Sequence, residues 1–245
     1  MERHSSNWLG SYYRVIGTTL VIDLGHARPV LSSAPHRGGF VRIRYILNHQ
    51  VELLPEGSQS KNWCDPGRYL TRVAASLGIH HRCVGFMTAV PMTRLVMLRE
   101  EDKRCGLWVE CFCTVGVTNA VKAGEPPVEP QFRRPLGTIN IILVTNARLV
   151  ASAMVGAVQV ATESKAAVLL ERVVRSSVSG ELATGTGTDA VAVACGLRGE
   201  GPVLRYSGTH TEIGAMIGRV VRQGVQLGLD RTDRRSNGYR SGTRG

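Results

Sequence analysis

The stretch from Gly137 to Gly218 constrains the fold more than any other part of this 245-residue chain. It alternates apolar runs of strand length, Thr138–Thr145 and Ala190–Cys195, with two longer helical patterns. One pattern extends from Ser152, a candidate N-cap, to about Val173, and the other from about His210 to Leu227. Strands and helices mixed in this way predict an α/β fold in which a sheet packs against long helices.

The rest of the chain adds elements of both kinds. A helix is expected over Pro66–Leu77, because Asp65 can cap it and proline suits its first position. The remaining expected strands are Thr18–Leu24, Phe40–Ile46, Arg94–Arg99, Leu107–Val117 and Val203–Tyr206. The proline-containing loop Ala123–Pro135 is a candidate lid or domain seam. Because strands and helices do not alternate strictly, we expect a mixed sheet, and a mixed α+β arrangement stays open.

Length and composition predict one domain, residues 1–229, followed by a basic tail. A chain of 245 residues suits a single large domain. Residues 230–245 carry five Arg against two Asp and no apolar residue apart from Tyr239. A segment with so little to bury is expected to be disordered.

The formal net charge of +11 raises the question of nucleic-acid binding. Outside the tail the basic residues are scattered, and aromatic residues make up only 5% of the chain, which leaves little material for base stacking. No apolar run approaches the ~18 residues that span a membrane, and the N-terminus lacks the pattern of a secretory signal. We therefore expect a cytoplasmic protein without nucleic-acid or membrane partners, and homo-oligomerisation stays open.

The helix from Ser152 places a charged residue within an apolar stripe. At about 100° per residue, Lys165 lies near the centre of the stripe and Glu163 on the opposite side. The stripe comprises Met154, Val155, Val158, Ala161, Val168 and Leu169. Lys165 either extends to the surface along its aliphatic stem or is buried against a partner, for which Asp189 or another carboxylate is suited. A buried amine is a candidate base, or a donor to developing negative charge.

The loop Thr184-Gly185-Thr186-Gly187-Thr188-Asp189 precedes a strongly apolar run. Its glycines allow close approach to backbone amides and its threonines add hydroxyls, so the loop is a candidate substrate cradle. It is not a P-loop, because GxxxxGK[ST] is absent and the loop leads into a strand. A tight turn before a buried strand is the alternative.

His210 and Ser33 are candidates for moving protons or attacking a substrate. Thr209 and Glu212 match a capping box, which would place His210 in the first turn of the last helix. The positive end of a helix favours neutral imidazole, which can act as a general base, although an exposed histidine without a role is the alternative. Ser32 and Ser33 are candidate nucleophiles, substrate ligands or plain loop residues. The GxSxG elbow of the α/β-hydrolases is missing.

Three asparagines near strand ends, Asn119, Asn140 and Asn146, suit hydrogen bonding to a polar substrate, although turn chemistry fits Asn146 best. No HExxH motif is present, and His80, His81 and Cys83 are only a weak metal signal. We expect no bound metal or cofactor.

Several motifs in register resemble the adenosylcobinamide amidohydrolases of corrinoid salvage. They are LSSAP and the following Gly-Gly (31–39), LNHQV (47–51), TVGVTNA (114–120), GTINIILVTNARL, ATESKAAVLLE, SGELATGTGTDAVAVAC and RYSGTHTEIGAMIG. The resemblance covers roughly residues 19 to 228. It implies hydrolysis of the amide that joins the corrin ring to its aminopropanol arm, which yields adenosylcobyric acid. His36 and Arg37 depart from the family pattern, which often has Asn before the Gly pair.

The resemblance also implies roles for the candidate residues. His210, Lys165, Glu163, Asp189 and Ser33 would be catalytic, and the substrate would contact Ser32, Asn119, Asn140 and the loop residues Thr184, Gly185, Thr186, Gly187 and Thr188. Two other functions stay open: a corrinoid carrier without catalysis, and a basic nucleic-acid-binding protein. The sequence does not choose between direct attack by water and a covalent nucleophile.

Overall fold

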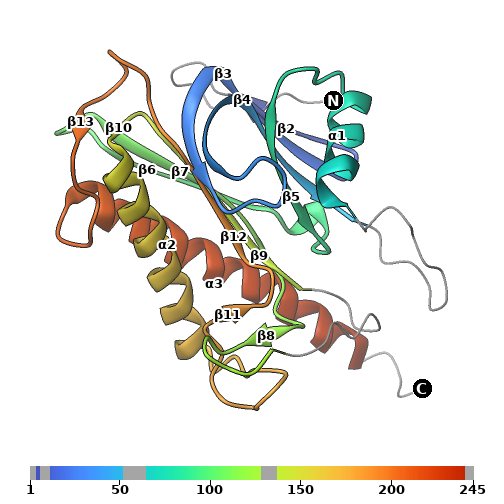
Figure 1. Cartoon of the computed structure of the whole chain (residues 1–245). Coiled ribbons are helices and arrows are strands. Elements are labelled where there is room, and N and C mark those ends of the chain that lie inside the picture. The colour runs from blue at the N-terminus through green and yellow to red at the C-terminus, as the bar shows by residue number, and fades with distance from the viewer. Residues whose placement is uncertain (1–3, 6–11, 52–64, 128–136, 241–245) are drawn as a thin grey trace.

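The computed structural model describes residues 4–5, 12–51, 65–127 and 137–240; for 4–5 and 233–240 it describes the backbone alone. A nine-stranded mixed sheet forms the centre (Figure 1). Its strands are β1 (His4–Ser5), β2 (Tyr12–Ile16), β3 (Thr19–Ser32), β4 (Gly39–Gln50), β5 (Cys83–Thr88), β6 (Val96–Asp102), β7 (Leu107–Val115), β9 (Ile139–Thr145) and β12 (Ala190–Ala194). The spatial order is β5-β4-β3-β12-β9-β7-β6, and β2 pairs with β3 and with β1. The β4–β5 and β9–β12 pairs are parallel and the others antiparallel.

Two small ladders and three helices complete the described fold. The antiparallel pair is β8 (Ala120–Val121) with β11 (Gly185–Thr186), and the parallel pair is β10 (Arg148–Leu149) with β13 (Val203–Leu204). The helices are α1 (Pro66–Ser76), α2 (Ala151–Glu171) and α3 (Glu212–Arg240), beside a short 3-10 turn at Met92–Arg94. Helices α2 and α3 lie together on one face of the sheet, and α1 lies beside β5 (Figure 1).

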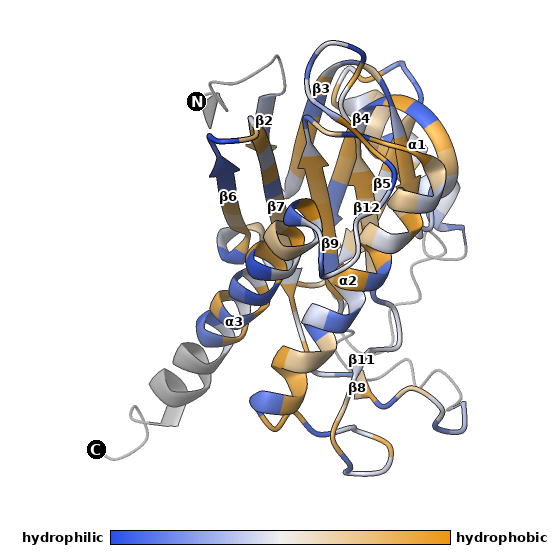
Figure 2. Cartoon of the chain, turned by 90° about the vertical axis from the view of Figure 1, so that its left-hand side faces the viewer, coloured by the Kyte–Doolittle hydropathy of each residue, from blue (hydrophilic) through white to orange (hydrophobic). Residues whose placement is uncertain are grey.

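The central strands are buried on both faces, which explains their continuous apolar sequence. In β9, Ile141 and Leu143 face the cluster formed with α2 and α3, whereas Ile142 and Val144 face a second cluster lined by β3, β4 and β5. The hydropathy colouring shows the same apolar strands between the helices (Figure 2). A third, smaller cluster joins α1 to β3, β4 and β5.

The sheet curls until strands that are not neighbours meet. The Asn140 side chain on β9 donates to Asn48 on β4 (3.0 Å) and to the Met87 carbonyl on β5 (2.9 Å). Asn48 in turn donates to Thr114 on β7 (3.1 Å). Since β3 and β12 separate β4 from β9 in the strand order, these bonds show that the ends of β4 and β5 fold back over the beginning of β9.

Most predicted elements are confirmed, with corrected ends. The strands predicted at 18–24 and 40–46 are parts of the longer β3 and β4, so Ser32 belongs to a strand. Asp65 caps α1 as predicted, accepting from the Arg68 amide at 2.9 Å. Ser152 does not cap α2, whose N-cap is Val150 without a side-chain bond. The loop predicted at 123–135 lies largely outside the described residues.

Helix α3 differs most from the sequence prediction. Thr211, not Thr209, caps it, because the Thr211 hydroxyl accepts from the Gly214 amide at 3.1 Å. The predicted capping box is therefore wrong, and His210 precedes the helix. The helix also continues to Arg240, into the segment predicted as a basic tail, whose disorder stays a prediction.

Helix α2 is the one helix in the described part of the chain that is long and apolar enough to cross a membrane. It qualifies by average composition, because Gln159, Glu163 and Lys165 interrupt its apolar residues, and no uninterrupted apolar run of this length occurs in α2. In the fold, α2 packs against β12 and α3 and buries Met154, Ala161 and Val168. Its apolar composition is accounted for by these contacts within the core.

Candidate active site

Lys165 is buried on α2 and forms an ion pair with Asp189. The Nζ–Oδ2 distance is 2.5 Å, and the two side chains are 9% and 13% exposed. The sequence left open whether Lys165 reaches the surface or finds a carboxylate; the structure shows the second arrangement, with the suggested partner. Of the predicted stripe, Met154, Ala161 and Val168 are buried with it, but Val155 is half exposed.

Asp189 is held by three further donors. Its Oδ1 accepts from the Ile139 amide (3.0 Å) and the Thr186 hydroxyl (2.5 Å), and its Oδ2 accepts from the Thr186 amide (3.0 Å). Together with Lys165, these bonds occupy both carboxylate oxygens, so the side chain has one fixed orientation. A carboxylate held in this way fixes the position of the ammonium that it pairs with.

Gly185 lets the loop approach the ion pair. A Cβ added there would lie 2.6 Å from Asp189 Oδ2 and 2.8 Å from Lys165 Nζ. No larger residue fits without displacing one of the two charges. The first glycine of the Gly/Thr loop is therefore explained by close packing around the ion pair.

The threonines of the loop are bonded within the protein. Thr184 Oγ1 accepts from the Ala123 amide (2.9 Å), Thr186 donates to Asp189, and Thr188 Oγ1 lies 3.4 Å from the Gly137 carbonyl. Gly187 and Thr188 are exposed at the tip. The loop thus fixes Asp189 internally and presents its tip to solvent, which leaves its predicted role as a substrate cradle untested.

Asn119 lies beside this tip. Its Nδ2 is the nearest atom to a Cβ added at Gly187, at 3.9 Å. Its Oδ1 is buried and has no hydrogen-bond partner among the described residues. A buried acceptor without a partner costs about 1–3 kcal/mol, so this oxygen is suited to receive an N–H group from a ligand.

Ser33 reaches the same edge of the sheet from β3. Its amide donates to the Val191 carbonyl (2.9 Å), and its hydroxyl accepts from the Val191 amide (3.0 Å). Ser33 is therefore opposite Val191 and diagonal to Asp189, a relation that places residues about 7–8 Å apart in a sheet. Its side chain is exposed, whereas Ser32 is buried and accepts from the Ala34 amide at 3.0 Å.

His210 and Glu163 are not brought to this cluster. Ser207, three residues before His210, donates to the Ala153 carbonyl in the first turn of α2. Lys165 is twelve residues further along α2, which corresponds to about 18 Å of helix. Glu163 is exposed on the opposite side of α2 from Lys165, as its spacing predicted.

The remaining asparagines are tied into the fold. Asn140 is 2% exposed and belongs to the network with Asn48 and Thr114. Asn146 accepts from the Trp108 amide (3.0 Å) and donates to the Gly106 carbonyl (2.7 Å), so its side chain connects the end of β9 to the start of β7 rather than closing a local turn. Asn48 and Thr114 lie within the motifs LNHQV and TVGVTNA, but no role was predicted for them.

His36 lies in the turn between β3 and β4. Its backbone bonds to Gly85 of β5 in both directions (3.3 and 3.1 Å), and Arg37 has a positive φ of 52°. Burial, followed by the nearby Arg37 charge, lowers the pKa of the His36 imidazole. These two positions therefore attach the β3–β4 turn to β5.

No group of three or more His, Cys, Asp or Glu side chains is gathered as metal ligands would be among the residues that the structure describes. The described cysteines, Cys83, Cys105, Cys111, Cys113 and Cys195, are free. Cys111 and Cys113 both face the α2–α3 cluster, as their alternation predicted, and burial raises the pKa of the Cys111 thiol to about 12.

Comparison with known proteins gives one consistent result. The family model of adenosylcobinamide amidohydrolases matches residues 10–237. An adenosylcobinamide amidohydrolase of Methanosarcina mazei is 34% identical over 225 residues, which cover 89% of this chain and 97% of that protein. A protein of the same name from Halobacterium salinarum is 36% identical over 148 residues, 59% of either chain. An uncharacterised protein of Methanocaldococcus jannaschii is 32% identical over 234 residues, 88% of this chain and 87% of its own.

Proposed function

The chain belongs to the adenosylcobinamide amidohydrolase family, and from this we propose that the Lys165–Asp189 ion pair is the centre at which it hydrolyses its substrate. The enzyme is an amidohydrolase of cobinamide salvage. Water cleaves the amide between the corrin ring and the aminopropanol arm of adenosylcobinamide, giving adenosylcobyric acid and the free amine. The observation that carries the proposal is a buried cation fixed by a fully bonded carboxylate beside an exposed loop tip.

Lys165 stabilises the transition state in this proposal. When a nucleophile adds to the amide carbon, negative charge moves to the carbonyl oxygen, and a positioned cation in a water-poor site stabilises that charge. One of the three ammonium donors is used by Asp189, which leaves others for the substrate oxygen. Asp189 is a positioning residue, since it acts through Lys165.

Asn119 recognises an amide of the substrate. Its unpaired buried Oδ1 accepts a hydrogen bond from an N–H group, either of the scissile amide or of a neighbouring amide arm of the corrin. The substrate then supplies the partner that the described residues do not provide. In this proposal Asn119 contributes to substrate binding rather than to bond cleavage.

The nucleophile is either water or Ser33, and kinetics can decide between them. Ser33 is exposed and diagonal to Asp189. A covalent route releases aminopropanol in a burst before adenosylcobyric acid appears, and the burst is absent in Ser33→Ala. If water attacks directly, the two products form together and Ser33→Ala retains turnover within a few-fold. Glu163 and His210 have no part in this proposal, because their positions lie away from the ion pair.

The test of the proposal is Lys165→Met, which keeps the stem length and removes the amine. We expect the variant to bind adenosylcobinamide and to lose on the order of 10²-fold or more in turnover, the scale for removing one oxyanion donor. Products are followed by mass spectrometry and folding by circular dichroism. Glu163→Gln is the matched control, because it changes an exposed charge on the same helix, and its turnover should stay within about twofold. A folded Lys165→Met enzyme with turnover within a few-fold of the parent would refute the proposal.

A further inference from the structure

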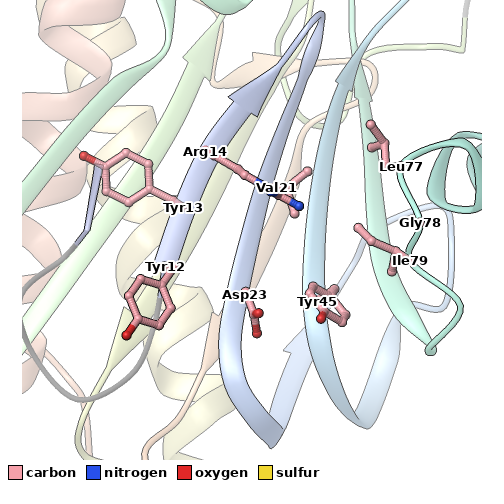
Figure 3. A pocket seen from close by; sticks show the side chains of 9 residues that line it. All are labelled: Tyr12, Tyr13, Arg14, Val21, Asp23, Tyr45, Leu77, Gly78 and Ile79. Carbon is pink, nitrogen blue, oxygen red and sulfur yellow. The ribbon is translucent and has the colours of Figure 1, made fainter. Parts of the chain in front are cut away.

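Two cavities adjoin on the face of β3 and β4 that is turned towards α1. The first, of about 320 Å³, is lined by Tyr12, Tyr13, Arg14, Val21, Asp23, Tyr45, Leu77, Gly78 and Ile79 (Figure 3). The second, of about 340 Å³, is lined by Gly25, His26, Ala27, Arg42, Ile43, Arg44, His81 and Arg82. Neither is lined by a residue of the Lys165–Asp189 site.

The cavities form one continuous surface. Asp23 of the first is bonded to Arg44 of the second through two hydrogen bonds of 2.7 and 2.8 Å. The Tyr45 ring of the first stacks on the His81 ring of the second, with centroids 6.3 Å apart and planes inclined by 16°. The Arg44 guanidinium also lies 5.1 Å from the centre of the Tyr45 ring. These pairs put the linings of the two cavities in direct contact, so the cavities are close enough for one ligand to span them.

The second cavity has the chemistry of an anion site. Its lining includes three arginines and two histidines and no carboxylate. Asp23 pairs with Arg44, but neither Arg42 nor Arg82 has a carboxylate partner in the described part of the chain. One Arg42 nitrogen donates to the Ala27 carbonyl at 2.9 Å, which orients the guanidinium and leaves other donors free. Arginine forks match the oxygens of a phosphate group.

The first cavity has the chemistry of a slot for a planar ring. Its floor includes Val21 and Ile79, which are buried, and its rim includes the Tyr12 ring, which is 53% exposed. Figure 3 shows Tyr12 on β2 at one side and Leu77 and Ile79 at the other, with Tyr45 between them. An aromatic ring on an apolar floor binds a planar ligand by stacking.

From this juxtaposition we propose that the enzyme has a second ligand site, at which a nucleoside phosphate binds with its base in the first cavity and its phosphates on Arg42 and Arg82. Cavities of about 300–1,000 Å³ hold small ligands, so the two together suit a nucleotide. Stacking supplies the preference for a base, and the arginines supply the preference for phosphate. The site is independent of the proposed catalytic centre.

The experiment titrates the full-length enzyme with ADP, adenosine and inorganic phosphate by calorimetry. We expect saturable one-to-one binding of ADP, at least tenfold tighter than either adenosine or phosphate alone, and weaker at higher salt because charged contacts are screened. The double variant Arg42→Gln/Arg82→Gln should lose at least tenfold in ADP affinity and little in adenosine affinity. Tyr12→Ala should weaken both ligands. Arg198→Gln/Arg205→Gln, which removes two exposed arginines elsewhere, is the charge-matched control and should bind ADP as the parent does.

Three results would overturn the proposal. The first is no saturable ADP binding at millimolar concentration, and the second is ADP binding that the arginine and Tyr12 variants leave unchanged. The third is competition of ADP with adenosylcobinamide that persists in those variants, since it would place ADP at the catalytic centre. Single-stranded RNA that binds more tightly as its length grows, in the parent but not in the double variant, would assign the surface to nucleic acid instead. Amide hydrolysis in the double variant should match the parent, which keeps this test separate from that of Lys165.

Discussion

At Gly185 the missing side chain allows two charged groups and a loop to share one small space. A Cβ there would lie 2.6 Å from the Asp189 carboxylate and 2.8 Å from the Lys165 amine, closer than carbon approaches either atom. We predict that Gly185→Ala displaces the ammonium and lowers turnover by on the order of tenfold or more, because misplaced catalytic groups lose efficiency steeply. Gly218→Ala is the control, since its nearest neighbour would be Ser164 Oγ at 3.5 Å. Equal turnover in the two variants would contradict the geometry.

Asn119 permits a test in which stability and substrate binding change in opposite directions. Removing a buried group that has no partner in the described part of the chain is neutral or stabilising for the fold. Asn119→Ala should therefore keep or raise the melting temperature, yet raise KM about tenfold, the effect of one lost hydrogen bond of about 1.4 kcal/mol. Asn140→Ala should instead destabilise the fold, because it leaves Asn48 and the Met87 carbonyl without their partner. An unchanged KM in Asn119→Ala would remove this residue from substrate binding.

Part of the site follows from residue spacing alone. A buried lysine within an apolar stripe needs a partner, and this requirement indicated Asp189 or another carboxylate, of which Asp189 is the one observed. The spacing of Glu163, two residues earlier, indicated its outward direction. The position of His210 did not follow, because two threonines of similar capping ability lie on either side of it. Which of them caps depends on how Ser207 packs against α2, a contact between distant segments, and on how Gly208 packs against the first turn of α3.

At the scale of elements, long apolar runs and capped helices were predicted, and short or irregular strands were not. Helix α1 carries its start signal in Asp65 and Pro66, and β9 is a pure apolar run. Strand β5 was missed because Cys83–Thr88 contains a glycine and lacks alternation. That glycine, Gly85, packs against Leu70 of α1 and against His36. The need for a glycine there therefore comes from tertiary contacts and not from the local sequence.

A histidine connects three of these elements and should make the fold sensitive to acid. One ring nitrogen of His49, on β4, lies 2.7 Å from Thr19 Oγ1 on β3, and the other 2.9 Å from Tyr69 Oη on α1. Burial lowers the pKa of this imidazole. The unfolded chain, in which histidine has a pKa of about 6.5, then takes up the proton first as the pH falls. The contribution of His49 to the free energy of unfolding is fully present above the pKa of the unfolded chain. It is lost as the pH falls through the lower pKa of the folded protein.

The prediction is that the melting temperature falls between pH 7 and pH 5, and falls less in His49→Gln. Burial also lowers the pKa of His36. In His49→Gln, His36 therefore still contributes to the fall of the melting temperature with pH. Differential scanning calorimetry at several pH values measures the slopes. His210→Gln is the control, because it removes an exposed histidine. The same pH slope in His49→Gln and in the parent would contradict this account.

At the scale of the whole molecule, the pairing of β3 with β12 and the packing of α2 bring the pieces of the site together. Strands β3, β12 and β9 are adjacent although the chain between them is long. The hydrogen bonds of Asn48 with Asn140 and Thr114 hold the end of β4 against β9 and β7. Sequence patterns report each strand but not its neighbours, since pairing depends on contacts between distant segments. The α/β class and single domain were therefore predictable, whereas the strand order and the curl were not.

The long C-terminal helix gives a last prediction, because its buried residues and its surface contacts end at different places. Val225 and Leu229 are buried against the sheet and α2. Beyond them, Asp230 pairs with Arg172 at 2.7 Å, and Arg231 donates to the Leu95 carbonyl. Chains ending after Gly224, Leu229 and Thr232 remove these contacts in steps.

The chain that ends after Thr232 keeps every side-chain contact described for α3, so its melting temperature should stay within about 2 °C of the parent and its turnover within about twofold. Ending after Leu229 removes the half-exposed ion pair and the Arg231 bond, which are worth about 1 kcal/mol each at most and lower the melting temperature by a few degrees. Ending after Gly224 also removes two buried side chains at about 1.5–3 kcal/mol each, and should lower it by about 10 °C or more. Thermal unfolding measures the melting temperature of each of the three chains, and we expect it to fall as the chain is shortened. If the chain ending after Thr232 melts as low as the shortest one, the stabilising contacts of α3 lie beyond Thr232 rather than in the core.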